Sequence, residues 1–376
     1  MRRAFLFCPE NDIALGRNCS RFTPPRQAAL LARYGAPLMW WLGDETDYVL
    51  VPEPSDVEYA RSLASWEREM AERFGPGPRI VTSLDGLEVD NLCPWGWSGY
   101  AAQLFKAAGA ETAVLQRCVP DVQALRELSH RRSATIINEA LAKDVDWEGF
   151  DHPVPAGAVE ARDIDAVRSF IDRHEAFYAK SPWSSSGRGV VCSRGVPALR
   201  VLERCAAVIR EQGAVMMEPE YDKALDFAML FYCDPDKRVR FHGYSRFFNA
   251  RSTAYTGNLI APDAEILGTL IRYVDEALLS AVRGALESIL TRLAGNRYQG
   301  FLGVDMMVAR TGGAFRLIPC VELNLRMTMG VVAHALWHRC GMRGQMCIEP
   351  GAHGELLNED VGLVPINRNF MIKLRP

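Results

Sequence analysis

The sequence lacks long hydrophobic runs and paired cysteines. No stretch reaches the roughly 18 uninterrupted apolar residues that a membrane-spanning helix needs. Its 10 cysteines are scattered without a C-x-x-C pair, and several lie in apolar stretches such as residues 229–233. We therefore expect reduced thiols that pack as small hydrophobic side chains, and neither a disulfide framework nor a zinc site.

An excess of positive charge is absent as well. Lysine and arginine number 43 against 46 acidic residues, a net charge of −3, so no overall positive field attracts a polyanion. We expect neither nucleic acid nor a membrane among the partners. The apolar run from Ala4 to Cys8 ends at Pro9, which predicts a buried first strand and not a secretion signal. We therefore expect a cytoplasmic protein; its oligomeric state is not indicated by the sequence.

Short apolar strands alternate with helical patterns over residues 1–125. Strands are expected near 4–7, 48–51 and 79–81, and helices near 25–34, 56–74 and 100–108. This alternation predicts an open, mostly parallel α/β domain. Two segments with polar or aromatic residues, 9–12 and 94–98, stand where small-molecule sites occur in such sheets. Alternatively, Trp95 and Trp97 fill a seam between domains.

The remainder of the chain predicts longer strands. A strand ending at Lys180 precedes a Ser/Gly loop, a helix near 198–211 and a strand at 214–217. Further strands are expected at 226–233, 239–248, 303–309 and 315–323, around a helical stretch at 262–293. The excess of strands predicts an antiparallel sheet with helices on one face, an α+β arrangement.

A basic residue followed by small polar residues begins at Lys180. Three serines and a glycine follow closely, at Ser184, Ser185, Ser186 and Gly187. A positive charge, hydroxyl groups and a backbone that permits close approach are what phosphate groups require. The segment is not a Walker loop, because the lysine precedes the glycines. The alternative is a flexible turn without a ligand.

Two later strands each carry a carboxylate. Asp305 lies in an otherwise apolar run, and Glu322 and Asn324, two positions apart, project to the same face of one strand. Carboxylate and amide oxygens suit Mg²⁺ that bridges nucleotide phosphates. The alternative is a structural ion pair of Arg326 with Asp305 or Glu322.

A strand that ends at Glu218 and continues through Pro219 suits a hinge between two lobes. The backbone of such a hinge can hydrogen-bond the edge of a planar base. Met216, Met217 and Leu225 either flank that base or belong to the core.

The order and spacing of these three segments resemble the ATP-grasp superfamily. The likeness covers roughly residues 126–345 and includes Tyr178 to Lys180, Met217 to Tyr221 with Asp226, Gly303 to Asp305, and Glu322 to Arg326. It implies an N-terminal open parallel α/β domain at 1–125 and a two-lobed ATP-grasp domain at 126–376, with lobes at 126–217 and 218–376.

The resemblance also implies binding roles for ATP and for Mg²⁺, or Mn²⁺ in its place. The phosphates would be bound by Lys180 and by Arg131 or Arg132, and the loop with Ser184, Ser185, Ser186 and Gly187 would fold over them. Glu218 and the backbone of Glu220 or Tyr221 would contact adenine, and Asp226 would lie near the ribose. The binding roles for the metal fall on Asp305, Glu322 and Asn324.

The activity implied is a ligase that joins a carboxylate to an amine, or to a thiol, through an acyl phosphate. Arg326 would stabilise the transferred phosphoryl group, and Arg246 would assist from a segment expected to line the cleft, with Arg251 and Asn258 as weaker candidates. The partners would be a small-molecule carboxylate and an amine, with amino acids and peptides among the options. The alternatives are a kinase of the same superfamily and a nucleotide-binding module without turnover.

Overall fold

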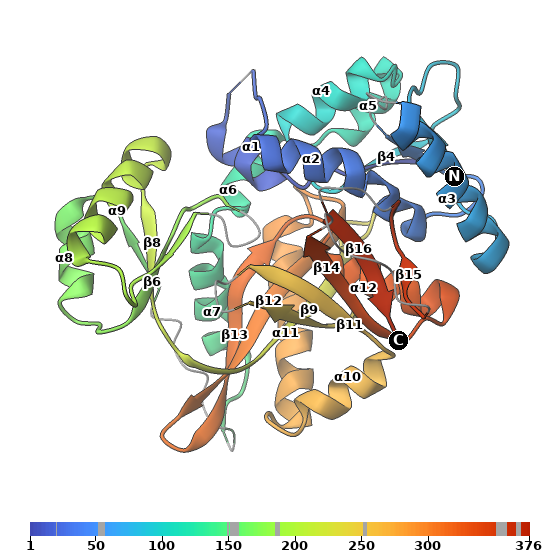
Figure 1. The fold of residues 1–376 in the computed structure, drawn as a ribbon. Helices are drawn as coiled ribbons and strands as arrows, with labels where there is room; N and C mark the ends of the chain where they lie inside the picture. The colour runs from blue at the N-terminus through green and yellow to red at the C-terminus, as the bar shows by residue number, and fades with distance from the viewer. Residues whose placement is uncertain are drawn as a thin grey trace.

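Three β-sheets organise the chain in this computed structural model, which describes residues 1–19, 21–51, 57–148, 150, 158–184, 189–250, 254–350, 359–365 and 370–376 (Figure 1). The first sheet belongs to the N-terminal part, the second to a small lobe at the left of Figure 1, and the third to the body of the molecule. Each is described with the helices that pack on it.

The N-terminal sheet is four-stranded, and all its pairings are parallel. Its strands, in the order β3-β2-β1-β4, are β1 (Arg3–Leu6), β2 (Tyr48–Leu50), β3 (Arg79–Val81) and β4 (Asn91–Pro94). Its helical elements are α1 (Asn11–Arg17), α2 (Arg26–Gly35), η1 (Ala36–Leu42), α3 (Val57–Phe74), α4 (Gly99–Ala107) and α5 (Thr112–Cys118). The prediction of an open parallel α/β sheet is confirmed.

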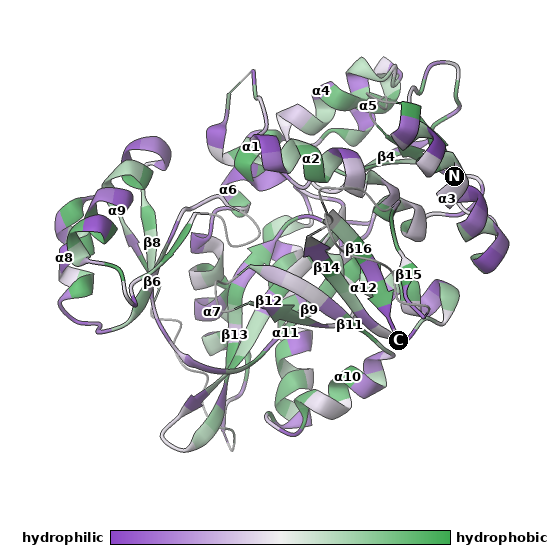
Figure 2. Ribbon diagram, viewed as in Figure 1, coloured by the Kyte–Doolittle hydropathy of each residue, from purple (hydrophilic) through white to green (hydrophobic). Residues whose placement is uncertain are grey.

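The small lobe is an antiparallel sheet under two helices. Its strands, in the order β5-β8-β6-β7, are β5 (Val159–Ala161), β6 (Phe177–Lys180), β7 (Val190–Cys192) and β8 (Val215–Pro219). Helices α8 (Ile164–Ile171) and α9 (Ala198–Gln212) carry both hydrophobic and hydrophilic residues (Figure 2) and bury Val167, Phe170 and Val201 against the sheet. These buried residues form a cluster of their own, so the lobe has a separate hydrophobic core.

The third sheet has eight strands in the order β13-β12-β9-β10-β11-β14-β16-β15, all antiparallel to their neighbours. Its strands are β9 (Asp222–Cys233), β10 (Val239–Asn249), β11 (Tyr255–Ile260), β12 (Gly300–Thr311), β13 (Ala314–Asn324), β14 (Gly344–Pro350), β15 (Val361–Gly362) and β16 (Phe370–Arg375). The antiparallel sheet was predicted, and the four expected strands correspond to β9, β10, β12 and β13. Strands β11, β14, β15 and β16 were not anticipated.

The two faces of the large sheet have different coverings. Phe227 and Met306, which pair across β9 and β12, belong to the core that includes Leu286 and Ile289 of α11 (Glu276–Ala294). The opposite face meets α12 (Met329–Cys340), where a Cβ on Gly330 would lie 2.4 Å from the Ser245 hydroxyl. The expectation of helices on one face is therefore wrong, since α12 covers part of the second face.

The N-terminal part packs against the C-terminal strands. Residues of β1, η1 and α3 share one core with α12, β14 and β16. The indole nitrogens of Trp41 and Trp66 donate to the carbonyls of Leu363 and Gly362, each at 2.9 Å. Because each bond joins segments about 300 residues apart, the first strands and the last strands form one body.

Three further helices complete the described structure: α6 (Val122–Leu128), α7 (Arg132–Asp144) and α10 (Asp263–Leu270). Helix α7 packs on strand β13 of the large sheet and on helix α11. Domain boundaries at 125/126 and 217/218 stay a prediction.

Within the described ranges, no helix combines the length and the apolarity needed to span a membrane. All 10 cysteines are free thiols.

Helix α12 carries a half-buried imidazole, His334. Its ring centroid lies 4.4 Å from that of His242 and 4.1 Å from that of His338, and Asp263 is the nearest carboxylate, at 4.0 Å. Burial, together with the neighbouring imidazoles, lowers the pKa of His334 to about 3. No group of three or more His, Cys, Asp or Glu residues within the described chain is arranged to hold a metal.

We expect the substitution His334→Phe to make stability less sensitive to acid. The native imidazole stays neutral down to about pH 3, whereas the unfolded chain binds a proton below roughly pH 6.5, so the wild-type protein loses stability as the pH falls through this range. Phenylalanine binds no proton. Thermal denaturation near pH 7.5 and pH 5 measures the effect: the drop in Tm should be smaller in the variant, and equal drops would contradict the lowered pKa.

Candidate active site

A cavity of about 340 Å³ lies where the three parts of the molecule meet. Its lining includes Lys180 of the small lobe, Asp305 of the large sheet and Trp95 of the N-terminal part. The volume falls within the roughly 300–1,000 Å³ typical of small-molecule sites. Trp95 therefore contributes to a cavity wall, while Trp97 is buried in the adjoining core.

Two carboxylates and an amide project into this cavity from β12 and β13. Asp305 pairs directly with Glu322, and Asn324 pairs with Gly303 two positions further along the same face. All three line the cavity. Burial, and then the negative charge of Glu322, raise the pKa of Asp305 to about 7. Carboxylates held this close repel each other, and a divalent cation with hard oxygen ligands relieves that repulsion. The residues present thus fit a magnesium ion whose remaining ligands come from a bound molecule.

Lys180 ends β6 and faces Glu218 of β8. Its ammonium group donates to the Glu218 carboxylate, and both side chains line the cavity. Beyond Lys180, the loop returns to β7 through Gly189, whose φ of +70° suits glycine and where a Cβ would lie 2.7 Å from the Ser181 hydroxyl. Of the predicted loop residues, Ser185, Ser186 and Gly187 lie outside the described residues.

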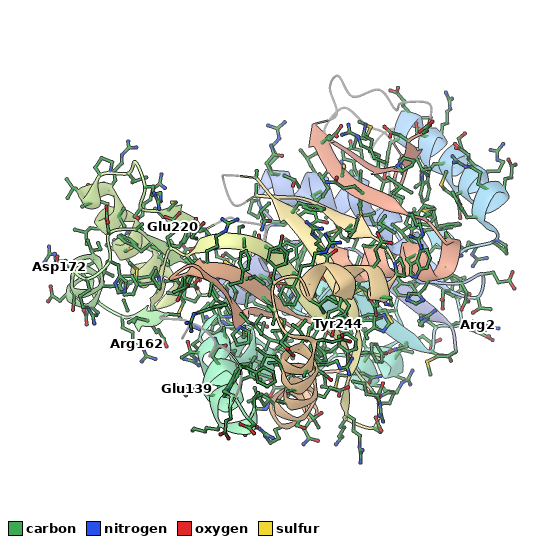
Figure 3. The ribbon with its side chains drawn as sticks, turned by 90° about the horizontal axis from the view of Figure 1, so that it is seen from below. Arg2, Glu139, Arg162, Asp172, Glu220 and Tyr244 are labelled. Atoms are coloured by element: carbon green, nitrogen blue, oxygen red, sulfur yellow. The ribbon has the colours of Figure 1, made fainter. Side chains whose placement is uncertain are left out.

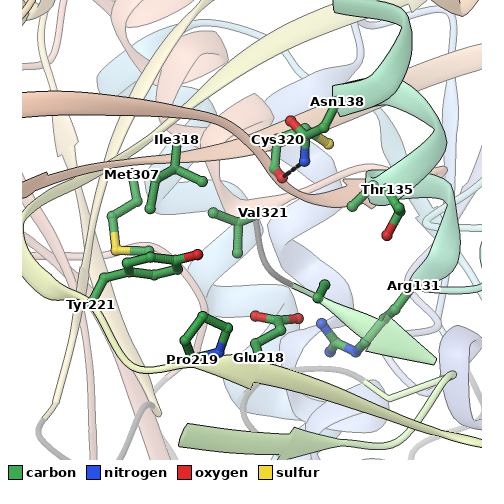
Figure 4. A pocket seen from close by; sticks show the side chains of 12 residues that line it. Arg131, Thr135, Asn138, Glu218, Pro219, Tyr221, Met307, Ile318, Cys320 and Val321 are labelled. Atoms are coloured by element: carbon green, nitrogen blue, oxygen red, sulfur yellow. Dashed lines mark hydrogen bonds between the residues drawn. The ribbon is translucent and has the colours of Figure 1, made fainter. Parts of the chain in front are cut away.

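Arg131, just before α7, is buried between the small lobe and the large sheet. Its guanidinium lies 2.7 Å from the Glu322 carboxylate and donates to the Ser181 carbonyl at 3.0 Å and to the Ser184 hydroxyl at 3.2 Å. Burial by itself lowers the pKa of Arg131, but the charges of Glu322 and Glu218 outweigh it and hold the pKa above its ordinary value. Figure 4 shows its guanidinium beside Glu218.

Of the two basic residues considered for the phosphate contact, the structure brings Arg131 to the cavity. Arg132 lies 4.0 Å from Glu160 and is 40% exposed, and it is not among the cavity's lining residues. Ser184 is buried behind Arg131 and is likewise not among the lining residues.

An apolar recess of about 20 Å³ adjoins the cavity near the Glu218 hinge (Figure 4). Its walls include Pro219, Tyr221, Met307, Ile318 and Val321. Met216, Met217 and Leu225 are buried, in keeping with the core alternative, and none of them lines the recess or the cavity; Met307 and Val321 line both.

Glu220 points away from the cavity. Its carboxylate pairs with Arg194 at 2.6 Å, and its backbone N–H donates to the Ala176 carbonyl at 2.9 Å. Figure 3 shows Glu220 on the side of the small lobe with Arg162 and Asp172. Tyr221 lines both spaces, whereas Glu220 lines neither, and Tyr221 is therefore the better candidate for a base contact.

Asp226 on β9 lines the cavity as predicted. Its carboxylate accepts from Asn249 at 3.0 Å and from the Lys223 ammonium at 2.5 Å. These contacts fix the carboxylate at the edge of the site on the side of the hinge.

Arg326 follows β13 and contacts the N-terminal part directly. Its Nε donates to Asp12 at 2.8 Å, and the backbone N–H of Met327 donates to the Trp95 carbonyl at 2.7 Å. A Cβ on Gly96 would lie 2.6 Å from the Asn11 amide and 2.9 Å from Arg326. The loops after β1 and β4 therefore close tightly on Arg326. Asp12 was not identified individually, although its segment stood out in the sequence as a polar stretch after a strand.

Known structures share this architecture. No protein-family model matches the chain, and no curated protein matches its sequence. Similar solved structures include N5-carboxyaminoimidazole synthetase from Staphylococcus aureus with ADP (TM-score 0.51, 10% identity, 99% of this chain and 92% of that chain). Biotin carboxylase from Campylobacter jejuni in a beta-gamma-ATP complex gives a TM-score of 0.52 at 13% identity, over 99% of this chain and 86% of that chain. The biotin carboxylase domain of Hydrogenobacter thermophilus 2-oxoglutarate carboxylase, with MgADP, ADP and bicarbonate, gives a TM-score of 0.51 at 10% identity, over 99% of this chain and 85% of that chain.

The chain has the ATP-grasp fold. The likeness spans the N-terminal sheet as well as both later sheets, since it covers 99% of the chain. At identities of 10–13% it establishes the fold, and what the ATP-grasp cavity does here has to be argued from its own residues.

One predicted residue lies on the wrong face of the ATP-grasp sheet. Arg246 pairs with Phe227, which in turn pairs with Met306, on the face that packs on α11. Its neighbours Ser245 and Phe247 line the cavity, because alternate residues of a strand face opposite sides. Arg246 is therefore not a cavity residue. Arg251 lies outside the described residues, and Asn258 is a buried part of the cavity wall.

We expect Asp12 and Arg326 to be energetically coupled. Each side chain is 14% exposed, so removing one partner leaves a largely buried charge unpaired. A double-mutant cycle with Asp12→Asn, Arg326→Gln and the double variant should give a coupling of about 1–3 kcal/mol in urea unfolding.

The exposed pair Arg292–Asp144, at 2.6 Å and with exposures of 59% and 36%, is the matched control and should couple by less than about 1 kcal/mol. Additive effects of the Asp12 and Arg326 substitutions would show that the contact between the two parts carries no energy.

Proposed function

We propose that this protein is an ATP-dependent ligase that activates a small carboxylate as an acyl phosphate and joins it to an amine, or to a thiol. The observation that carries the proposal is the arrangement around one cavity of Asp305, Glu322 and Asn324 with the cations of Lys180 and Arg326. Oxygen ligands for a metal and cations for phosphates are the two requirements of phosphoryl transfer from ATP. Similar folds bound to ADP and MgADP support a nucleotide as the occupant.

The nucleotide would lie along the hinge end of the cavity. We assign Lys180 and Arg131 to its phosphates, Glu218 to the adenine amino group, and Asp226 to the ribose. The apolar walls at Met307 and Val321 suit the faces of the base. The Tyr221 backbone would complete the base contact, in keeping with its place at the mouth of the recess.

A bound Mg²⁺, or Mn²⁺, would neutralise phosphate charge, held by Asp305, Glu322 and Asn324. In the structure each cation among the described lining residues is paired with a carboxylate: Lys180 with Glu218, Arg131 with Glu322, Lys223 with Asp226, and Arg326 with Asp12. Pairing keeps buried charges neutralised. A metal held by Glu322 would free Arg131 for a phosphate, so these residues would favour joint binding of metal and nucleotide.

The chemistry would run in two steps. An oxygen of the substrate carboxylate attacks the γ-phosphorus of ATP, the bond to the bridging oxygen breaks, and ADP leaves with that electron pair. The amine then attacks the acyl carbon, phosphate leaves with the electrons of the C–O bond, and the amine proton passes to phosphate or solvent. Arg326 would hold the transferred phosphoryl group, which the protein needs to position rather than to attack.

The carboxylate and the amine, with amino acids and peptides among the options, belong to this proposal, as does a cytoplasmic location. The 10 free thiols support a reducing compartment.

We expect Lys180→Ala and Asp305→Asn to lower ATP-dependent ADP formation by about 10²–10³-fold, because each removes a charge that stabilises the phosphoryl-transfer transition state. ADP is measured by a coupled assay in a screen of carboxylates, with hydroxylamine present to trap any acyl phosphate as a hydroxamate. Lys143→Ala and Asp165→Asn change exposed residues on α7 and α8 and should retain activity.

Two other outcomes would contradict this expectation. A stable phosphorylated product with no hydroxamate identifies a kinase. Activity unchanged in both site variants excludes the assigned site.

We also expect MgADP to raise the Tm of the wild-type protein more than ADP alone does. At a fixed ligand concentration, tighter binding to the native state raises Tm further, and the metal adds to the affinity only through its ligands. In Glu322→Gln the extra shift given by magnesium should disappear while a shift with ADP remains. An undiminished magnesium effect in this variant would place the metal elsewhere. A Tm shift without any ADP formation, for every carboxylate tested, identifies a binding module.

A further inference from the structure

The cavity has a charged end and an apolar end. Every charged residue among its described lining residues belongs to the small lobe, to the start of α7, to β9, or to β12 and β13 with the turn after them. The other end is walled by Phe7, Leu31, Leu38 and Trp95 of the N-terminal part and by Ile348 and Ile372 of β14 and β16. The boundary between the ends lies at Arg326, which contacts the N-terminal part through Asp12.

The polar groups at the apolar end are neutral, and most of their hydrogen bonds are already made. The Asn258 amide donates to the Ser245 hydroxyl at 2.7 Å and to the Arg246 carbonyl at 3.2 Å, and it accepts from the Tyr255 hydroxyl at 2.5 Å. What remains for a ligand is a small number of hydroxyl contacts, from Ser245 and Thr328.

The two ends share one continuous floor. Glu322, Asp305, Ala228 and Ser245 lie directly opposite one another across β13, β12, β9 and β10. Because neighbouring strands are about 4.8 Å apart, Ser245 lies roughly 10 Å from the metal ligand Asp305. A molecule with its reactive group near Asp305 therefore extends its body over Ser245 toward β11, β14 and β16.

Such a body cannot carry charge without cost. A buried phosphate or second carboxylate needs a paired cation, and no cation stands among the described lining residues of the apolar end. The cations at the charged end, Arg131, Lys180 and Lys223, are paired with carboxylates, and Arg326 at the boundary is paired with Asp12. An aliphatic or aromatic group, by contrast, gains free energy from apolar walls in proportion to the area that it buries.

We propose that the carboxylate substrate has an uncharged, predominantly apolar body, bound between the N-terminal part and strands β14 and β16, with its carboxylate toward Arg326 and the metal ligands. The inference rests on the proposed ligase function and deepens it by naming the class of carboxylate. Phosphorylated and dicarboxylic acids are excluded as preferred substrates.

The test compares carboxylates with the full-length protein, MgATP and hydroxylamine. The probes are straight-chain acids from acetate to octanoate, 3-phenylpropionate, succinate and 3-phosphoglycerate. We expect hydroxamate formation to rise along the straight chain, with kcat/KM increasing by up to about tenfold for each added methylene until the cavity is filled. A preference for succinate or 3-phosphoglycerate overturns the proposal.

Variants of the apolar wall provide the second arm. Leu31→Arg and Ile348→Arg each place a cation at the apolar end, and both positions are only partly buried. Each should lower kcat/KM for 3-phenylpropionate by at least about tenfold and shift the preference toward succinate, while the conservative control Leu31→Met retains the wild-type preference. An unchanged preference in both arginine variants, with the MgADP shift in Tm intact, contradicts the assigned wall.

Binding separates this inference from the ligase proposal. Protection of the MgADP-loaded protein against thermal unfolding is measured with the same acids in the absence of turnover. Protection by apolar acids without ADP formation supports the substrate class and removes the ligase. ADP formation with charged acids, together with no protection by apolar acids, supports the ligase and overturns the proposed substrate class.

Discussion

Three buried ion pairs decide how this cavity is built. Lys180 pairs with Glu218 between two strands of the small lobe, Arg131 with Glu322 between the start of α7 and β13, and Arg326 with Asp12 between the large sheet and the N-terminal part. A charge removed from water without a partner is costly, so each pair fixes the two segments that contribute to it. The same groups are those that phosphates and a metal would use. The charged side chains of the site thus hold one another in place before any ligand arrives, and a ligand that uses them has to replace these ion pairs.

The three parts of the molecule are joined unequally. The N-terminal part and the C-terminal strands share a core and the hydrogen bonds of Trp41 and Trp66, whereas the small lobe encloses its hydrophobic residues within itself. Its links to the body include the contacts of Arg131 and the hinge at Pro219. A ligand can replace polar contacts of this kind, whereas two parts that share an apolar core are harder to separate. Lobe movement on nucleotide binding is accordingly expected to leave the apolar end of the cavity intact.

Local sequence patterns predicted the site residues whose placement is set by a single strand, and they missed those whose placement is set by contacts between several segments. The positions of Glu322 and Asn324 follow from the alternation of a single strand, and Asp305 was recognisable as a lone acid in an apolar run. Arg246 was misplaced because the face of a strand is set by its pairing with β9, which no local pattern reveals. For Glu220 the prediction concerned its backbone, whose N–H donates to the Ala176 carbonyl, a contact between separate segments of the small lobe that no local pattern indicates. The pairing of Asp12 with Arg326 spans 314 residues and depends wholly on how the domains pack.

Register is the property on which the candidate chemistry finally depends. Shifting β12 by one residue against β9 would turn Asp305 from the cavity face toward the core, since side chains alternate faces. Leu302 and Val304 of β12, which pair with Phe231 and Met229 of β9 on the core face, oppose such a shift, because each would then face the polar side. The pairing of β12 with β13 changes register just after Asp305, and such irregularities re-aim side chains near functional sites. The apolar row on the far side of β12 therefore keeps Asp305 on the cavity face, where it pairs with Glu322 of β13.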